Sequence, residues 1–148
     1  MNFLERLFQP EIIKSESADT AHLVQLSTAT LLVEMSRADF ITDTSEQDAI
    51  RSLLNTHFSL SADETESLME LARAEADDMV SVQHLTRILM AQTDHKTRVN
   101  IVEMLWQVVY ADDEKHHYEE HFVRQVSELL YVSHAEFIQA RHKAEPTD

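Results

Sequence analysis

Carboxylate side chains gather in two short segments that link predicted helices. The first segment, residues 39–46, contains Asp39, Asp43 and Glu46, and the second, residues 112–119, contains Asp112, Asp113 and Glu119. We call these two segments the acidic elbows. Carboxylate oxygens are ligands that hard divalent cations prefer. The elbows therefore predict a site for calcium or magnesium, and Glu34, just over one helical turn before Asp39, is a further candidate ligand.

Each elbow begins with an aspartate at the C-terminal end of a predicted helix, where a negative charge opposes the helix dipole. Such a charge costs roughly 0.3–1 kcal/mol, so its presence in both elbows predicts a compensating positive charge. A bound cation would supply that charge, and so would Arg51 or Arg124, in which case no metal is needed. The glutamates have a simpler explanation, because a carboxylate in the first turn of a helix suits the dipole. A solvated acidic helix end is the alternative that needs no ligand.

The two elbows belong to an internal repeat with an offset of 73 positions, which shortens to 72 near its end. The matched pairs are Asp39 with Asp112, Glu46 with Glu119, Ile50 with Val123, Arg51 with Arg124, Ser61 with Ser133 and Glu64 with Glu136. The repeat predicts two halves with the same order: a buried helix, an elbow, an amphipathic helix and a capped helix. The halves differ at one candidate ligand, because Glu34 corresponds to Gln107.

Helical periodicity runs through the chain between its only two prolines, Pro10 and Pro146. Apolar residues recur three and four positions apart, which is typical of amphipathic helices. The segment around 97–111 is apolar on nearly every side, and we expect it to form a buried central pair with a helix over 19–38. Ser61 and Ser133 each begin a capping box, which marks the start of a helix. The sequence predicts an all-α, single compact bundle of about seven helices.

Composition excludes several classes of function. The 27 acidic residues outnumber the 12 basic residues and give a formal net charge of −15, which repels the phosphates of nucleic acids. The chain has no cysteine and no glycine, so thiolate metal sites and glycine-rich phosphate-binding loops are excluded. No apolar run is long enough to span a membrane, and the N-terminus lacks a secretory signal. We expect a cytoplasmic protein whose residues 1–18 form a short helix or are disordered, with at most peripheral membrane association.

A histidine-rich segment offers a competing kind of site. The run His117-Tyr118-Glu119-Glu120-His121 matches the H-x-x-E-H pattern of inverted zinc peptidases. Such an enzyme also needs a further carboxylate ligand and a substrate cleft, and only 27 residues follow His121. An enzyme with two carboxylate-bridged metals would need Glu-x-x-His on two buried helices, and that spacing occurs once, at an elbow. The sequence therefore predicts no enzymatic activity.

The elbows also carry a family resemblance that covers nearly the whole chain. The runs Arg37-Ala38-Asp39-Phe40 with Glu46, and Tyr110-Ala111-Asp112-Asp113 with Glu119, resemble the duplicated Ala-Asp-Gly turn of the TerB-like, tellurite-resistance family. The resemblance implies one helical domain over residues 19–144, with halves at about 19–75 and 95–144. It also implies divalent-metal binding through the elbow acids, in a context of stress and tellurite resistance. The sequence departs from the motif where Phe40 and Asp113 replace glycine, and a bulky Phe40 resists the left-handed conformation that glycine allows.

The sequence thus predicts a binding module without enzymatic activity. The elbows hold a divalent cation, calcium or magnesium, which the fold itself does not require. The alternative is a protein-interaction scaffold with no metal role, because residues 61–80 carry seven acidic side chains against Arg73 alone. That stretch is most simply a solvated helix face. We expect other proteins as partners and no nucleic acid, and a homodimer stays open as an alternative.

Overall fold

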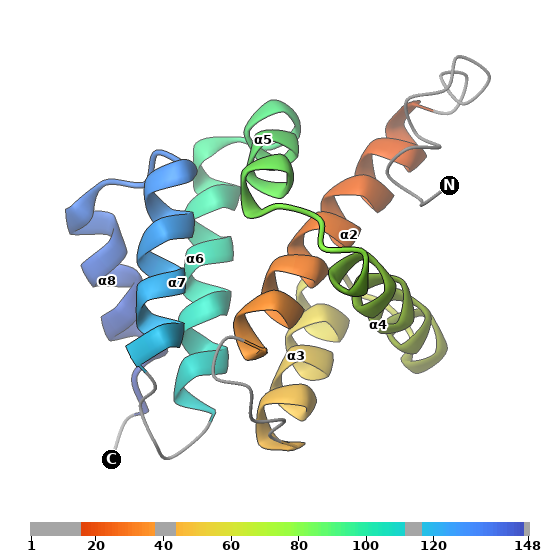
Figure 1. Cartoon of the computed structure of the whole chain (residues 1–148), viewed down its shortest axis with the longest axis horizontal. Coiled ribbons are helices and arrows are strands. Elements are labelled where there is room, and N and C mark those ends of the chain that lie inside the picture. Colours follow the sequence, from red (N-terminus) through yellow and green to blue (C-terminus); the bar gives the residue numbers. More distant parts are fainter. Residues whose placement is uncertain (1–15, 38–43, 112–116, 147–148) are drawn as a thin grey trace.

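Seven α-helices account for nearly all of the residues that the computed structural model describes, which are 16–37, 44–111 and 117–146. The helices are α2 (Glu16–Ser36), α3 (Thr44–His57), α4 (Ala62–Asp77), α5 (Val82–Gln92), α6 (His95–Tyr110), α7 (His117–Leu129) and α8 (His134–Ala144) (Figure 1). The helix expected over 19–38 runs from residue 16 to 36. The predicted N-terminal segment, residues 1–18, lies outside the described residues except for the first turn of α2.

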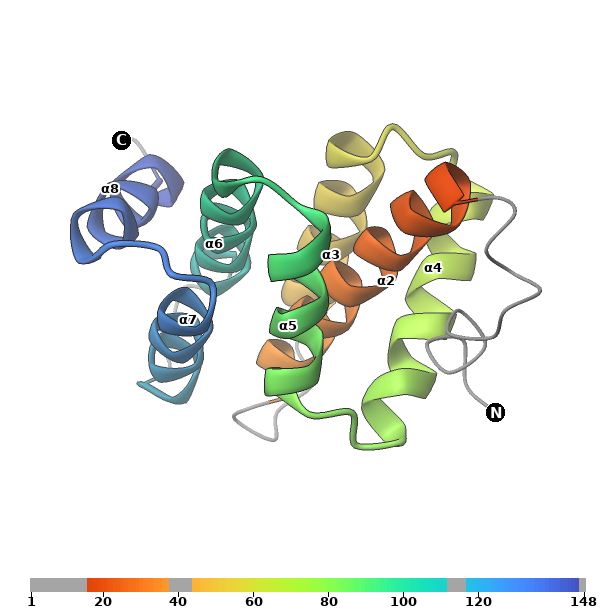
Figure 2. The ribbon, with the colours of Figure 1, turned by 90° about the horizontal axis from the view of Figure 1, so that it is seen from above.

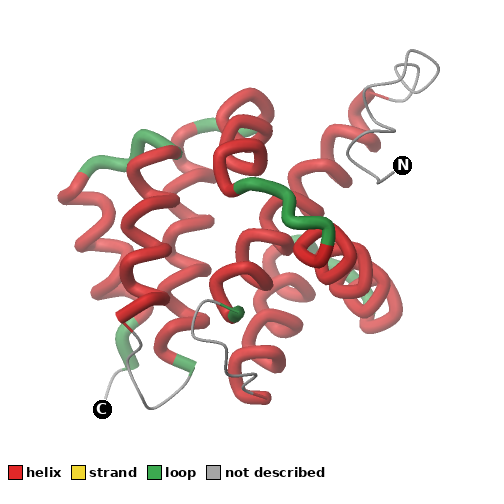
Figure 3. Tube along the Cα trace, viewed as in Figure 1, coloured by secondary structure: helices red, strands yellow, loops and turns green. Residues whose placement is uncertain are grey.

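The helices form two groups that meet along α2 and α6. Helices α2, α3 and α4 make one side of the molecule and α6, α7 and α8 make the other, with α5 between them (Figures 1 and 2). Helix α4 packs on α2, α8 packs on α6, and α3 and α7 bridge toward the opposite group. Figure 3 shows helices joined by turns, with no strand in the described part of the chain. The all-α prediction is confirmed.

Helices α2 and α6 supply nearly half of the buried hydrophobic residues in the described part of the chain. In α6 the large side chains of Ile101, Leu105 and Trp106 are at most 1% exposed, as the apolar pattern predicts. Helix α2 is buried on every side from residue 26 to 33, although this stretch includes polar residues. The hydroxyl of Thr30 donates a hydrogen bond to the Leu26 carbonyl at 2.7 Å, so a polar side chain is satisfied within its own helix. Both helices are buried as predicted. Helix α2 packs mainly on α4 and α5, and α6 packs mainly on α8, so their association as a central pair stays a prediction.

The chain makes its tight turns without glycine. Ser59, Met79 and Tyr131 follow the ends of α3, α4 and α7 with positive φ angles of 54°, 60° and 56°. This left-handed conformation ends helices and is usually reserved for glycine, because a side chain's Cβ crowds the backbone there. The predicted capping boxes at Ser61 and Ser133 are both confirmed, with each serine accepting from the backbone of the glutamate three residues on. Within the described ranges, no helix is both long enough and apolar enough to cross a bilayer.

The α3–α4 and α7–α8 turns have the same hydrogen bonds. The Leu60 amide donates to the Asn55 carbonyl at 3.0 Å, and the Val132 amide donates to the Ser127 carbonyl at 3.0 Å. Both pairs close the same kind of helix-ending turn, and a capping box follows each. The α4–α5 turn has the same kind of bond, from the Val80 amide to the Glu75 carbonyl at 3.4 Å, so this geometry is not specific to the predicted repeat. The pseudo-symmetry of the halves as wholes stays a prediction.

Candidate functional site

The acidic elbows lie between α2 and α3 and between α6 and α7. Helix α2 ends at Ser36 and α3 begins at Thr44, while α6 ends at Tyr110 and α7 begins at His117. Four of the predicted ligands, Asp39, Asp43, Asp112 and Asp113, lie outside the described residues. The described candidate ligands are Glu34, Glu46 and Glu119.

Glu46 and Glu119 are both completely buried, with 0% of each residue exposed. Each is the third residue of its helix, α3 or α7. The expected place in the first helical turn is therefore confirmed, but complete burial was not expected. Each glutamate lies four positions before a buried apolar residue, Ile50 or Val123, and shares its helix face. Exposed Glu64 also lies four positions before a buried residue, Leu68, so the spacing alone does not predict the burial.

A carboxylate inside a protein core needs compensation for the hydration that it loses. Without pairing and hydrogen bonds, the effective penalty for a buried ion is several kcal/mol. The first turn of a helix lowers that penalty, because backbone N–H groups and the helix dipole favour negative charge there. Neither glutamate is isolated, since each has further interactions within the protein. Both elbows thus combine a buried glutamate with an adjoining acidic segment.

The two arginines that could have neutralised the elbows are engaged elsewhere. Arg51 donates to Glu66 at 2.5 Å and to Asp48 at 3.2 Å. The guanidinium of Arg124 lies over the ring of Phe137, 4.9 Å from its centroid. Within the described part of the chain, neither arginine pairs with a predicted metal ligand. The alternative in which Arg51 or Arg124 replaces a metal therefore finds no support among these contacts.

Glu34 lies on α2, two residues before its end, and faces α4. Partial burial raises the pKa of its carboxyl group, Arg37 lowers it and Asp77 raises it. Arg37 itself pairs with Asp77 at 2.8 Å, which ties the end of α2 to the end of α4. The end of α2 also contacts α3, because the Gln47 amide donates to the Ser36 hydroxyl at 3.2 Å. Glu34 is thus near the first elbow, but its described electrostatic neighbours are Arg37, which directly follows α2, and Asp77, which ends α4.

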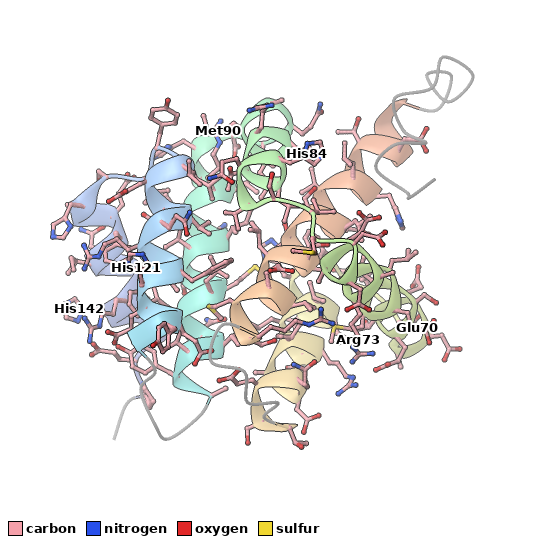
Figure 4. All side chains as sticks on the ribbon, viewed as in Figure 1. Glu70, Arg73, His84, Met90, His121 and His142 are labelled. Atoms are coloured by element: carbon pink, nitrogen blue, oxygen red, sulfur yellow. The ribbon has the colours of Figure 1, made fainter. Side chains whose placement is uncertain are left out.

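The histidine-rich motif is spread over different surroundings. His121 is exposed on α7 (Figure 4), whereas Glu120 lies 3.8 Å from the guanidinium of Arg141 on α8. Glu119, between the histidines, points into the core. In the described ranges, no three His, Asp or Glu side chains converge as a metal site requires. That statement does not extend to the elbow aspartates, which lie outside those ranges.

Glu75 is a buried acid that sequence reasoning missed. Residues 61–80 were expected to form a solvated face, but Glu75 on α4 is only 3% exposed and has interactions within the protein. The available signal is its spacing, because Glu75 follows buried Leu68 and Ala72 at helical intervals of seven and three. The other acids of this stretch are exposed, so the expectation is wrong for one side chain and holds for the rest.

The comparisons with known proteins agree with the resemblance carried by the elbows. A family model described as tellurite resistance protein TerB matches residues 25–142, which include both elbows and run from α2 into α8. No curated protein and no solved structure matches the chain significantly.

Proposed function

Because the chain belongs to the TerB family, we propose that it is a non-enzymatic binding module whose acidic elbows coordinate a divalent cation. The ligand sets are Asp39, Asp43 and Glu46 at the first elbow and Asp112, Asp113 and Glu119 at the second, with Glu34 as an additional acid. Oxygen-only ligands favour calcium or magnesium over softer metals. The proposed setting is tellurite resistance or a related stress response in the cytoplasm.

The observation that carries this proposal is the complete burial of Glu46 and Glu119 at equivalent positions of two helices. Nothing in helix capping requires a first-turn glutamate to leave solvent, since Glu64 and Glu136 cap their helices without becoming buried. A glutamate held in the core beside a segment with two aspartates is instead suited to anchor a cation from the inside. The elbow aspartates would then complete the ligand set from the outside.

The alternative proposal is an acidic scaffold that binds proteins without a metal. The observation in its favour is the row of exposed acids along α4 and its C-cap, which includes Asp63, Glu70 and the capping Asp78. Two further acids of this helix, Glu66 and Asp77, are paired with Arg51 and Arg37. Part of the row is therefore neutralised within the protein, which makes the elbows the more distinctive feature.

Metal titration separates the two proposals. The full chain is stripped of metal with EDTA and titrated with calcium or magnesium while the melting temperature and amide NMR spectrum are recorded. Binding at a concentration about 100 times Kd adds about 2.7 kcal/mol of stability, which raises the melting temperature of a chain of this size by roughly 5–10 °C. Amide shifts should concentrate at the starts of α3 and α7.

Two double variants are compared, and each replaces two carboxylates with amides of nearly the same shape. The change in net charge is therefore the same in both. Asp112→Asn with Glu119→Gln should abolish the response at the second elbow, measured relative to each variant's own metal-free melting temperature. Glu70→Gln with Glu128→Gln, two exposed positions, should leave the response intact. If neither ion changes the melting temperature or the spectrum at millimolar concentration, the metal proposal fails and the scaffold remains.

A further inference from the structure

A small groove between α3 and α6 is distinct from both elbows. Its volume is about 240 Å³, and Leu53, Thr56 and His57 line it from α3. From α6 it is lined by Met104 and by three polar residues, Asn100, Glu103 and Gln107. Ligand pockets for drug-sized molecules occupy roughly 300–1,000 Å³. The groove is therefore of a size to take one side chain of a partner and not a large cofactor.

The α6 side of this groove is the polar stripe of an otherwise apolar helix. Asn100, Glu103 and Gln107 follow one another at helical intervals of three and four, and all three are partly exposed. Buried apolar side chains such as Leu105 and Val108 occupy the remaining faces of α6 between them. The central helix thus reaches solvent along this stripe, where the groove separates it from α3.

The polar side chains of the groove are left without polar partners in the described part of the chain. Among the described residues, Thr56, His57, Asn100, Glu103 and Gln107 make no side-chain hydrogen bond or ion pair with another residue. By contrast, Arg37 at the end of α2 is paired with Asp77 at the end of α4. In the groove, five such groups converge on one concave space, where they can exchange water for a ligand.

The charge of the groove selects a cation. Among the described residues that line it, Glu103 is the one acid and there is no lysine or arginine, and the chain carries a formal net charge of −15. A carboxylate beside two amide oxygens matches the fork of N–H donors on a guanidinium. The apolar surfaces of Leu53 and Met104 can cover an aliphatic stem. We propose that the α3–α6 groove binds an arginine side chain of a partner protein.

The larger depression near the start of α2 is less suited to this role. It has a volume of about 770 Å³ and is lined by Phe58, Asp94 and residues of α2. Asp94, the one carboxylate among its described lining residues, already accepts a hydrogen bond from the Thr97 amide at 2.8 Å as the cap of α6. That acid is committed to the fold, whereas Glu103 is not.

The test uses a blocked pentapeptide, Ala-Ala-Arg-Ala-Ala, added to the full chain in EDTA while NMR spectra are recorded. The side-chain NH₂ signals of Asn100 and Gln107 report directly on the groove. They should shift with the arginine peptide, and the same peptide with citrulline, a neutral residue of the same shape, should bind about tenfold more weakly. EDTA removes divalent cations, so the result is independent of the metal proposal.

Two variants with the same change in net charge distinguish the groove from general attraction to an acidic protein. Glu103→Gln should weaken the arginine peptide about tenfold. Glu70→Gln, on α4 at the side of the molecule remote from α6 (Figure 4), should not change its binding. Equal losses in both variants, equal binding of the citrulline peptide, or shifts confined to α4 would each overturn the proposal. The absence of any shift at Asn100 and Gln107 would do the same.

Discussion

Replacing Met79 and Tyr131 with glycine should make this protein more stable. Both residues end a helix with φ near 60°, a conformation that crowds Cβ against the backbone. Their side chains contribute little in return, because Met79 is 86% exposed and Tyr131 is 76% exposed. The hydrogen bonds of these turns join backbone groups, such as the Val132 amide and the Ser127 carbonyl, so glycine retains them.

The expected gain is the difference between two opposing effects. A non-glycine residue in the left-handed conformation costs roughly 1–2 kcal/mol, whereas glycine loses about 0.5–1 kcal/mol more than alanine through its freedom in the unfolded chain. Each substitution should therefore add about 0.5–1 kcal/mol to the free energy of unfolding. For a chain of this size the double variant should melt roughly 2–8 °C higher.

Urea unfolding and thermal melting, each followed by circular dichroism, measure this gain. Met79→Ala and Tyr131→Ala are the controls, because alanine removes the exposed side chain but keeps Cβ. Gln125→Gly is the opposite control, since Gln125 is exposed inside the right-handed helix α7 and glycine there should destabilise by roughly 0.5–1 kcal/mol. If the glycine variants are no more stable than the alanine variants, backbone crowding at positive φ is the wrong explanation.

Two further predictions concern charged side chains. Capping hydrogen bonds hold the pKa of three carboxyl groups below their usual values, and these groups are Glu64, Asp94 and Glu136. Their contribution is complete above the unfolded pKa and is lost as pH falls through the folded pKa. The urea concentration at the unfolding midpoint should therefore decrease as the pH is lowered below about 4.5. Glu136→Gln should reduce this pH dependence. Glu34, whose pKa is raised, acts in the opposite direction. Separately, Arg141→Ala should destabilise by about 1–2 kcal/mol in urea unfolding, because Arg141 donates to the Tyr110 hydroxyl at 2.9 Å and lies 5.2 Å from the Trp106 ring centroid. Arg87→Ala, at an exposed position, should change stability by less than about 0.5 kcal/mol, and an equal loss in both variants would contradict the role given to Arg141.

Local patterns in the sequence predicted the helices and several of their starts. The capping boxes at Ser61 and Ser133 depend on residues three positions apart, so the sequence specifies them directly. The apolar periodicity around Trp106 predicted a buried helix for the same reason. The positive-φ turns escaped prediction, because their usual signal is glycine and this chain has none.

Whether an individual charged side chain is buried or exposed could be determined only from the tertiary structure. Glu46, Glu75 and Glu119 have the same chemistry as the exposed acids around them, and only the packing of a neighbouring helix removes them from water. The α3–α6 groove likewise unites residues that are some fifty positions apart in the chain. The sequence by itself therefore determined the helices, their caps and the family, because those depend on neighbours within a few residues. Tertiary packing alone decided which carboxylates are buried and where polar groups converge, since burial is a property of surfaces that meet only after the chain has folded.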